Sequence, residues 1–440
     1  MKRKIMNALL DWKSKSVRKP LIVHGARQVG KTYILKEFAK ENFDNFVYIN
    51  FESNLLACSY FEGELEPERI IQYLEADSGQ RIEKTKTLIL FDEIQTCERA
   101  LTSLKYFNEL APEYAIVAAG SLLGVAIHRG KFSFPVGKVE ALTLHPLDFE
   151  EFLWALDQDA LSKEILNCFK KSSEMPEGLH VKSLELYRKY LIVGGMPECV
   201  RRYVETGTLL ESTSIQNSIL DQYIADMAKY SSNAESVKIR ACFQSIPAQL
   251  AKENKKFQYK VVKKGGTASL FGESIEWLRL SGIVTKVYKI NHAYDPISTY
   301  VDLSSYKLYM GDTGLLVAKT GISQQTILTE SDNIFMGAIT ENYVAQQLFA
   351  KGYELFYWES ESIAEVDFVV QRQEMIMAIE AKRSDHVKSR SLTLFGEKYA
   401  PKLKLRFSSR NFGVSDQLVS IPLYAVYCLP AFSESSGESN

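Results

Sequence analysis

The sequence predicts a multidomain α/β protein, and three observations support this fold class. The chain has 440 residues, which is too many for one ordinary hydrophobic core. Near the N-terminus apolar strand patterns alternate with helical patterns, and near the C-terminus a helical pattern precedes several strand patterns. The expected parts are a parallel-sheet domain at 1–150, a helical region at 151–235, a helix-and-hairpin domain at 236–325, an α/β domain at 326–430 and a disordered tail at 431–440.

Composition excludes several classes of protein. The 53 Lys and Arg residues balance 54 Asp and Glu residues, so no chain-wide positive field draws the protein to nucleic acid or membrane. The six cysteines form no CxxC pair, which argues against a zinc site or a disulfide framework. The N-terminal MKRKIMNALLDWKSKS has too short an apolar run for a signal peptide, and no later stretch could span a membrane. We expect a cytoplasmic protein with no membrane contact.

The first strand pattern, PLIVH, runs into a glycine-rich loop and then into a helical pattern, which is the arrangement of a P-loop. Glycines allow backbone N–H groups to approach phosphates closely, and the start of the following helix favours an anion. Lys31 adds a cation for the β- and γ-phosphates, and the Thr32 hydroxyl can hold Mg²⁺. The predicted ligands are therefore ATP and Mg²⁺. The predicted binding residues are Gly25, Ala26, Arg27, Gln28, Val29, Gly30, Lys31 and Thr32.

Two further strand patterns end in polar residues. KTLILFDEIQ ends in Asp92 and Glu93, where Asp92 would organise Mg²⁺ and Glu93 would orient the attacking water. The alternative is that both acids only cap the following helix. EYAIVAAGS ends in Ser121, which could sense the γ-phosphate, although serine is common at strand ends. The predicted catalytic residues are Lys31, Glu93 and Ser121.

The stretches HGARQVGKT, LILFDEIQ, AAGSLLG and PVGKVEALTLHPLDFEEFL resemble the prokaryotic AAA-type ATPase family that is usually followed by a DUF4143 domain. YLIVGGMPECV, FQSIPAQLAKENKKFQY, YKLYMGDTGLL and EVDFVV…IEAK continue this resemblance over nearly the whole chain. It implies an AAA-type P-loop ATPase domain at 1–150. It also raises the prospect of a homo-oligomer, because AAA-type sites often use a residue of a neighbouring subunit.

One departure from the family affects the catalytic arginine. Many relatives carry Gly-Arg where this chain has Gly137 and Lys138, and lysine cannot make the bidentate contact of a guanidinium. Arg129 is an alternative donor. Arg27 can either contact phosphate or pair with a carboxylate, and the sequence does not decide between these roles.

The region 236–325 reads as helices followed by two strands, IVTKVYKI and TYVDLSSYKLYM, which suggests a winged helix, and the family resemblance points the same way. A lysine-rich segment with interleaved Phe257 and Tyr259 could bind double-stranded DNA. Its alternatives are a solvated connection between helices and a surface for the ATPase domain or a protein partner. Its lysines are Lys252, Lys255, Lys256, Lys260, Lys263 and Lys264.

The C-terminal stretch contains an amphipathic helical pattern, GAITENYVAQQLFAKG, with Glu341, followed by LFYWES, AEVDFVV and MIMAIEAK as strands. Glu380 and Lys382 lie two apart and share one face of a strand, and a neighbouring strand could bring Asp367 beside them. Two carboxylates can hold Mg²⁺ or Mn²⁺ while lysine activates water, and Glu341 could orient that water.

This arrangement is similar to the PD-(D/E)XK nuclease core, although Glu365 and Val366 replace its leading proline. The alternative is a salt-bridged sheet without activity. For the whole chain we expect an ATP-binding, ATP-hydrolysing protein whose nucleotide state controls a winged-helix region and a nuclease-like domain. Two alternatives stay open: an ATP-gated metal-dependent DNA nuclease, and a non-enzymatic nucleotide switch that binds a protein partner.

Overall fold

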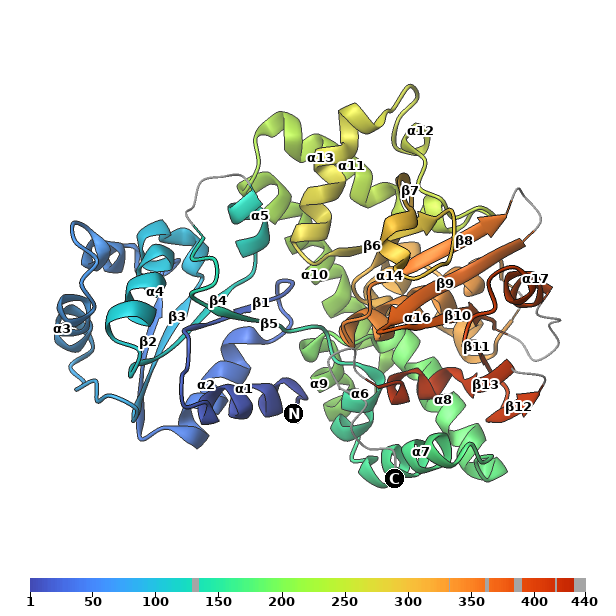
Figure 1. Ribbon diagram of the computed structural model, residues 1–440, viewed down its shortest axis with the longest axis horizontal. Coiled ribbons are helices and arrows are strands. Elements are labelled where there is room, and N and C mark those ends of the chain that lie inside the picture. The colour runs from blue at the N-terminus through green and yellow to red at the C-terminus, as the bar shows by residue number, and fades with distance from the viewer. Residues whose placement is uncertain (129–133, 332, 361–363, 384–389, 416–417, 431–440) are drawn as a thin grey trace. The chain divides into compact units, whose positions relative to one another are not determined.

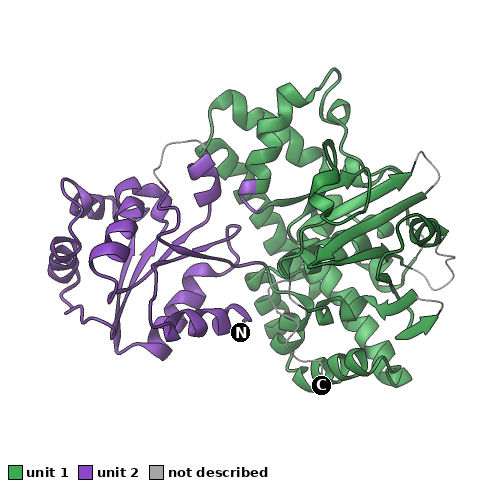
Figure 2. Ribbon diagram, viewed as in Figure 1, with its two compact units in different colours: residues 1, 146–279, 283–440 green, residues 2–145, 280–282 purple. Residues whose placement is uncertain are grey.

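The computed structural model describes residues 1–128, 134–331, 333–360, 364–383, 390–415 and 418–430. The chain forms two compact units, each with its own buried core (Figure 2). The N-terminal unit comprises residues 2–145 and 280–282, and the C-terminal unit comprises residue 1, residues 146–279 and residues 283–440. The two cores are therefore built largely from separate parts of the sequence.

The N-terminal unit contains a sheet whose described strands run in the order β2-β3-β4-β1-β5, with every neighbouring pair parallel (Figure 1). Parallel strands need crossover connections, and helices supply them here. All carboxyl ends of the strands consequently lie along one edge of the sheet. The strands are β1 (Leu21–His24), β2 (Asn45–Asn50), β3 (Thr87–Asp92), β4 (Ala115–Gly120) and β5 (Glu140–Thr143).

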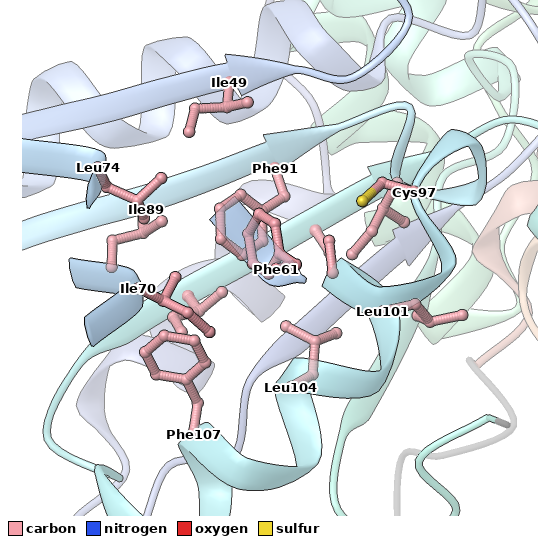
Figure 3. Packing of buried hydrophobic residues seen from close by; sticks show 14 of the residues in the cluster. Ile49, Phe61, Ile70, Leu74, Ile89, Phe91, Cys97, Leu101, Leu104 and Phe107 are labelled. Carbon is pink, nitrogen blue, oxygen red and sulfur yellow. The ribbon is translucent and has the colours of Figure 1, made fainter. Parts of the chain in front are cut away.

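The central strands β3 and β4 are buried on both faces, as expected for a parallel sheet. On one face Ile89 and Phe91 of β3 pack in a cluster with Leu104 and Phe107 of the helix α4 (Figure 3). The intervening β3 residues are buried as well. The helices of this unit are α1 (Ile5–Ser14), α2 (Lys31–Asn42), η1 (Leu55–Phe61), α3 (Pro67–Ser78), η2 (Ile94–Thr96), α4 (Glu98–Leu110) and α5 (Leu123–His128).

The C-terminal unit begins with a helical region, which packs around buried aromatic rings such as Phe152 and Tyr190, 5.2 Å apart between ring centroids. Its helices are α6 (Phe149–Ala155), α7 (Asp159–Lys171), α8 (Glu177–Val193), α9 (Pro197–Thr206) and α10 (Leu209–Lys229).

The predicted winged-helix region contains helices α11 (Asn233–Leu250), α12 (Tyr259–Val262) and α13 (Ala268–Leu280), followed by the antiparallel strands β6 (Val284–Ile290) and β7 (Val301–Met310). The strand β6 also pairs in parallel with β8 (Phe356–Ser360). The strand pair is therefore continuous with the C-terminal sheet, across the expected domain boundary.

The C-terminal sheet is mixed, and its described strands run in the order β12-β13-β11-β10-β9-β8-β6-β7 (Figure 1). The central strands β8, β9 and β10 are antiparallel, whereas β10 and β11 are parallel. The remaining elements are α14 (Thr313–Thr320), α15 (Gln324–Leu328), α16 (Met336–Ala350), β9 (Ala364–Arg372), β10 (Met375–Ala381), α17 (Arg390–Tyr399), β11 (Leu403–Ser408), β12 (Gly413–Ser415), β13 (Leu418–Pro422), η3 (Ile297–Tyr300) and η4 (Leu423–Cys428).

The helix α16 corrects the expectation of an amphipathic helix, because it is buried on nearly all sides. Its polar side chains serve as internal hydrogen-bond partners instead of facing water. Asn342 pairs with the backbone N–H and C=O of Met310, at 2.7 and 3.1 Å, and Gln347 accepts a hydrogen bond from the Phe149 backbone at 3.1 Å. Buried amides are tolerated here because backbone groups satisfy them.

None of the helices formed by the described residues is both long enough and apolar enough to cross a bilayer.

Candidate functional site

The glycine-rich loop connects β1 to α2 in a tight path that requires glycine. Gly25 has φ of +150°, and a Cβ at this position would lie 2.2 Å from the carbonyl oxygen of Leu144. Gly30 has φ of +92° and forms the N-cap of α2. The Lys31 ammonium folds over the loop and donates to the carbonyl oxygens of Gly25 at 3.0 Å and Ala26 at 2.9 Å. The loop thus has the backbone shape that close approach to phosphate requires.

Burial sets the charge state of Lys31. Its side chain is 6% exposed, and burial lowers its pKa to about 8, against the opposing effect of Glu93 and Asp92. Arg27 lowers it slightly further. His24, at the end of β1, also has a lowered pKa because of burial and the nearby Lys31 charge. A phosphate ligand would add the negative charge that favours the lysine cation.

Asp92 joins the loop to the neighbouring strands. The Thr32 hydroxyl donates to Oδ2 of Asp92 at 2.8 Å, although the two residues are sixty positions apart. The Tyr48 phenol donates to the same oxygen at 2.8 Å, and Asn50 lies at 3.5 Å from it. Burial raises the pKa of Tyr48 to about 12, so the phenol keeps the proton that it donates. The predicted Mg²⁺ ligands Thr32 and Asp92 are therefore adjacent.

Glu93 follows the strand end in a left-handed conformation, with φ of +51°. Its Oε2 atom accepts hydrogen bonds from Gln95 Nε2 at 2.5 Å and from the Ser121 hydroxyl at 3.3 Å. A Cβ on Gly120 would lie 2.5 Å from Oε1 of Gln95. The structure thus brings the predicted residues Glu93 and Ser121 together and adds Gln95 as the residue that orients Glu93.

The candidate cations lie in ion pairs or outside the described part of the chain. Arg27 lies 3.8 Å from Glu52, which favours the carboxylate alternative for that arginine. Lys138 pairs with Glu109 at 2.9 Å. Arg129 lies outside the described residues.

The sequence interpretation missed Tyr48, Asn50, Gln95 and His24. Three of them stand at or near carboxyl ends of parallel strands, which is the position where polar residues of such sheets gather. Gln95 stands two residues after Glu93 and points back to it. Their positions near strand ends, or near Glu93 in the sequence, could have identified these four residues as parts of the site.

In the C-terminal unit the antiparallel register brings two acids together. Ile379 of β10 pairs with Phe368 of β9, so the next pair sets Glu380 opposite Asp367 on one face of the sheet. The backbone N–H of Ala381 donates to Oδ2 of Asp367 at 2.9 Å. The predicted proximity of these carboxylates is present.

Glu380 is 3% exposed and pairs with Lys382, at 3.3 Å between Oε1 and Nζ. Its other oxygen, Oε2, is buried and has no hydrogen-bond partner within the described part of the chain. Burial favours a lower pKa for Lys382, but the charges of Asp367 and Glu380 outweigh this effect and raise the pKa. The lysine is therefore held as a cation beside both acids.

Glu341 of α16 is already engaged. It forms an ion pair with Lys255 and accepts a hydrogen bond from the Tyr309 phenol at 3.2 Å. Burial and the nearby charge of Asp367 raise the pKa of Glu341, while Lys255 and Lys307 act in the opposite direction.

Lys307 of β7 is a buried cation that the sequence interpretation missed. It is fully buried and pairs with Glu365. Burial favours a lower pKa for Lys307, but Glu365, Glu341 and Asp367 outweigh it and raise the pKa. We refer to these side chains together as the acid–lysine cluster: Lys255, Lys307, Glu341, Glu365, Asp367, Glu380 and Lys382. As they stand, no three acidic, histidine or cysteine side chains among the described residues are grouped to hold a metal ion.

The lysine-rich segment differs from a uniform basic patch. Lys255 is committed to Glu341, and Lys252 donates to Gln258 at 3.1 Å. Phe257 is buried and stacks on Tyr306 at 5.5 Å, so it belongs to the core and not to a nucleic-acid surface. The side chains on the exposed part of the segment are Lys260, Lys263 and Lys264.

Comparison with known proteins divides the chain into three matched regions. Residues 17–153 match an AAA domain, residues 184–326 match the domain of unknown function DUF8612, and residues 336–426 match the domain of unknown function DUF4143. No curated protein matches the chain.

Several solved structures are similar at low identity. A Walker-type ATPase of Pyrococcus abyssi is 14% identical over 72% of this chain and 95% of its own, with a TM-score of 0.45. Thermotoga maritima RuvB is 14% identical over 69% of this chain and 89% of its own, with a TM-score of 0.32. Aeropyrum pernix ORC2 is 13% identical over 75% and 91%, with a TM-score of 0.30. The family matches and the loop geometry together identify an AAA-type P-loop domain at residues 17–153, in a chain that also carries a DUF4143 domain at residues 336–426.

Proposed function

We propose that the N-terminal unit binds ATP with Mg²⁺ at the glycine-rich loop and hydrolyses it. The hydrogen bond between Thr32 and Asp92 is the observation that carries the proposal. It places a hydroxyl and a carboxylate, both oxygen ligands of the kind that Mg²⁺ prefers, beside the phosphate loop. The buried ammonium of Lys31 adds a cation for the phosphates of ATP.

Different residues would carry out phosphate binding, Mg²⁺ binding and activation of water. The loop backbone and Lys31 hold the phosphates, and Thr32 and Asp92 would hold Mg²⁺, which neutralises phosphate charge when it is bound. Glu93 orients the attacking water. Gln95 and Ser121 fix the Glu93 carboxylate through the bonds at 2.5 and 3.3 Å. Because Lys138 is paired with Glu109, we assign a catalytic arginine to Arg129 or to a neighbouring subunit of a homo-oligomer.

Two variants of the N-terminal unit test this proposal. Lys31→Ala should abolish binding of a fluorescent ATP analogue. Glu93→Gln should retain binding but stop phosphate release. Glu37→Gln, at a half-buried position of α2 where the acid pairs with Lys40, serves as the matched acid-to-amide control. Normal phosphate release by Glu93→Gln would refute the role of Glu93.

A second candidate function concerns the C-terminal unit: cleavage of double-stranded DNA, regulated by the nucleotide state. It is supported by Asp367 and Glu380 on adjacent strands, by Lys382 directly after β10, and by the buried Oε2 atom of Glu380. The element order α16-β8-β9-β10 agrees with the helix and three strands expected from the sequence. Asp367 and Glu380 would hold Mg²⁺ or Mn²⁺, Lys382 would activate water, and Glu341 would orient it. A winged-helix region with its lysine-rich segment would contact the duplex.

Cleavage of supercoiled and linear DNA with Mg²⁺ or Mn²⁺, with and without ATP, tests this second function. Cutting by the wild type and not by Glu380→Ala would support it, and a change of rate with ATP would support the coupling. Absence of cutting under all conditions, with ATP hydrolysis intact, would favour a nucleotide switch that acts through a protein partner.

A further inference from the structure

The acid–lysine cluster is a site for positive charge that the chain fills with its own lysines. Among the described residues, the four carboxylates of Glu341, Glu365, Asp367 and Glu380 interact with the ammonium groups of three lysines. With all seven side chains ionised, the cluster would carry one net negative charge, in a place where burial makes uncompensated charge costly. The oxygen Glu380 Oε2 is buried and has no hydrogen-bond partner among the described residues, so it is available as a ligand atom.

The three lysines differ in how easily they could leave. Lys307 lies in the middle of the sheet on β7, with 1% of its side chain exposed. Lys382 directly follows β10, and its backbone N–H donates to Phe407 at 2.8 Å. Lys255 comes from the segment between α11 and α12, outside regular structure, and has 17% of its side chain exposed. Lys255 is thus the cation that can withdraw without breaking the sheet.

Withdrawal of Lys255 changes what the cluster can bind. Glu341 would lose its ion-pair partner and keep the hydrogen bond from the Tyr309 phenol at 3.2 Å and the charge interaction with Lys307. The net charge of the cluster would become minus two, which matches a divalent cation. With Lys255 in place, the Glu341 carboxylate is occupied, consistent with the lack of a metal-binding group among the described residues.

We propose that Lys255 competes with a divalent metal ion for Glu341, so that the acid–lysine cluster binds metal when the lysine-rich segment moves away. Neighbouring lysines on the same segment, Lys260, Lys263 and Lys264, are exposed. The phosphates of a DNA duplex bound to them would attract Lys255 and release Glu341. Metal binding and duplex binding would then favour one another. This proposal rests on the second candidate function and assigns the control of that same site.

The test measures Mn²⁺ binding by paramagnetic resonance of the free ion, on the full-length protein without nucleotide. Lys255→Met should bind Mn²⁺ about tenfold or more tightly than the wild type, because one positive charge next to the site is removed. Lys182→Met removes an exposed lysine of α8 that lies outside both the cluster and the lysine-rich segment, and should match the wild type. Adding Glu380→Gln to Lys255→Met should abolish the gain. A folded Lys255→Met with wild-type Mn²⁺ affinity would overturn the proposal.

A second measurement avoids the variant at position 255. A short DNA duplex should raise the Mn²⁺ affinity of the wild type about tenfold. The Mn²⁺ bound by Glu380→Gln with the same duplex measures binding outside the cluster, including binding to the DNA, and is subtracted first. Equal binding by these two proteins would contradict the proposal even if Lys255→Met does not fold. DNA cleavage, measured in parallel, separates the two ideas. Tight Mn²⁺ binding by Lys255→Met without DNA cleavage would support the competition between Lys255 and metal for Glu341. It would refute the proposed nuclease activity.

Discussion

Gln95 donates a hydrogen bond through Nε2 to Oε2 of Glu93, with 2.5 Å between the two atoms. Glu93 stands in a left-handed backbone conformation, and the amide two residues later holds its carboxylate in one direction. Ser121 adds a longer bond to the same oxygen from the end of β4. A water-orienting acid depends on its direction, so the neighbour that fixes it should matter to hydrolysis.

Gln95→Ala should therefore lower the rate of ATP hydrolysis by about 10- to 100-fold while ATP affinity stays within about twofold. Ser121→Ala, which removes the longer bond, should have the smaller effect. Steady-state phosphate release and titration with a fluorescent ATP analogue provide the two readouts. An equal loss of affinity and rate would instead indicate that Gln95 supports the fold of the loop.

The lowered pKa of Lys31 predicts proton uptake when ATP binds. With a pKa of about 8, roughly half of the lysines are neutral at pH 8, and phosphate should restore the cation. Calorimetric titration with ATP in buffers of different ionisation enthalpy should then show uptake of about half a proton at pH 8 and little at pH 6.5. Binding without proton exchange at pH 8 would contradict the assigned state of Lys31.

Gly25→Ala should abolish ATP binding, because its Cβ would lie 2.2 Å from backbone oxygen at position 144. We expect a loss of stability of about 1 to 3 kcal/mol as well. Gly79→Ala is the matched control, since Gly79 also has positive φ but no atom within 4 Å of the added carbon. The Gly79→Ala substitution should lower the free energy of unfolding by only about 1 kcal/mol and leave ATP binding unchanged. Thermal unfolding and ATP titration compare the two variants.

Asp312 predicts a pH dependence of the stability of the C-terminal unit. Burial raises its pKa to about 6 from 3.8, against hydrogen bonds from the backbones of Gly195 and Leu315. The folded state then holds more protons than the unfolded state between these values. The contribution of Asp312 is fully present below about pH 4 and is lost as pH rises through 6, by about 3 kcal/mol. Urea unfolding of wild type and Asp312→Asn across this range should show that the variant lacks this slope.

Gln347→Ala should destabilise the C-terminal unit by about 2 to 3 kcal/mol. Its amide accepts from the Phe149 backbone and donates to the Tyr190 phenol at 3.3 Å, so truncation leaves buried groups unpaired. Gln325→Ala, at an exposed position of α15, should change stability by less than about 0.5 kcal/mol. Urea midpoints of the two variants test the difference, and similar midpoints would show that water replaces the lost amide.

The N-terminal site could be predicted because its chemistry follows the chain locally. Strand, glycine loop and helix are contiguous, and the strand that ends in Asp92 has a fully buried pattern. Partners such as Tyr48 could not be assigned, since their role depends on which strands are neighbours. In the acid–lysine cluster, too, residues whose place depends on the order of the strands could not be predicted. Asp367 and Glu380 follow from strand alternation, whereas Lys307 belongs to a strand that reaches the site only through the order of the sheet. The buried helix α16 was misjudged because its amides serve interior backbone groups.

The parallel pairing of β6 with β8 restricts how this protein can be divided or rearranged. A chain truncated after residue 325 would lose β8 and leave β6 with an open edge of N–H and C=O groups, which invites aggregation. A chain beginning at residue 326 would expose the opposite edge, on β8. Exchange of modules between relatives would therefore succeed more readily near residue 146, where the two units divide, than inside the shared sheet.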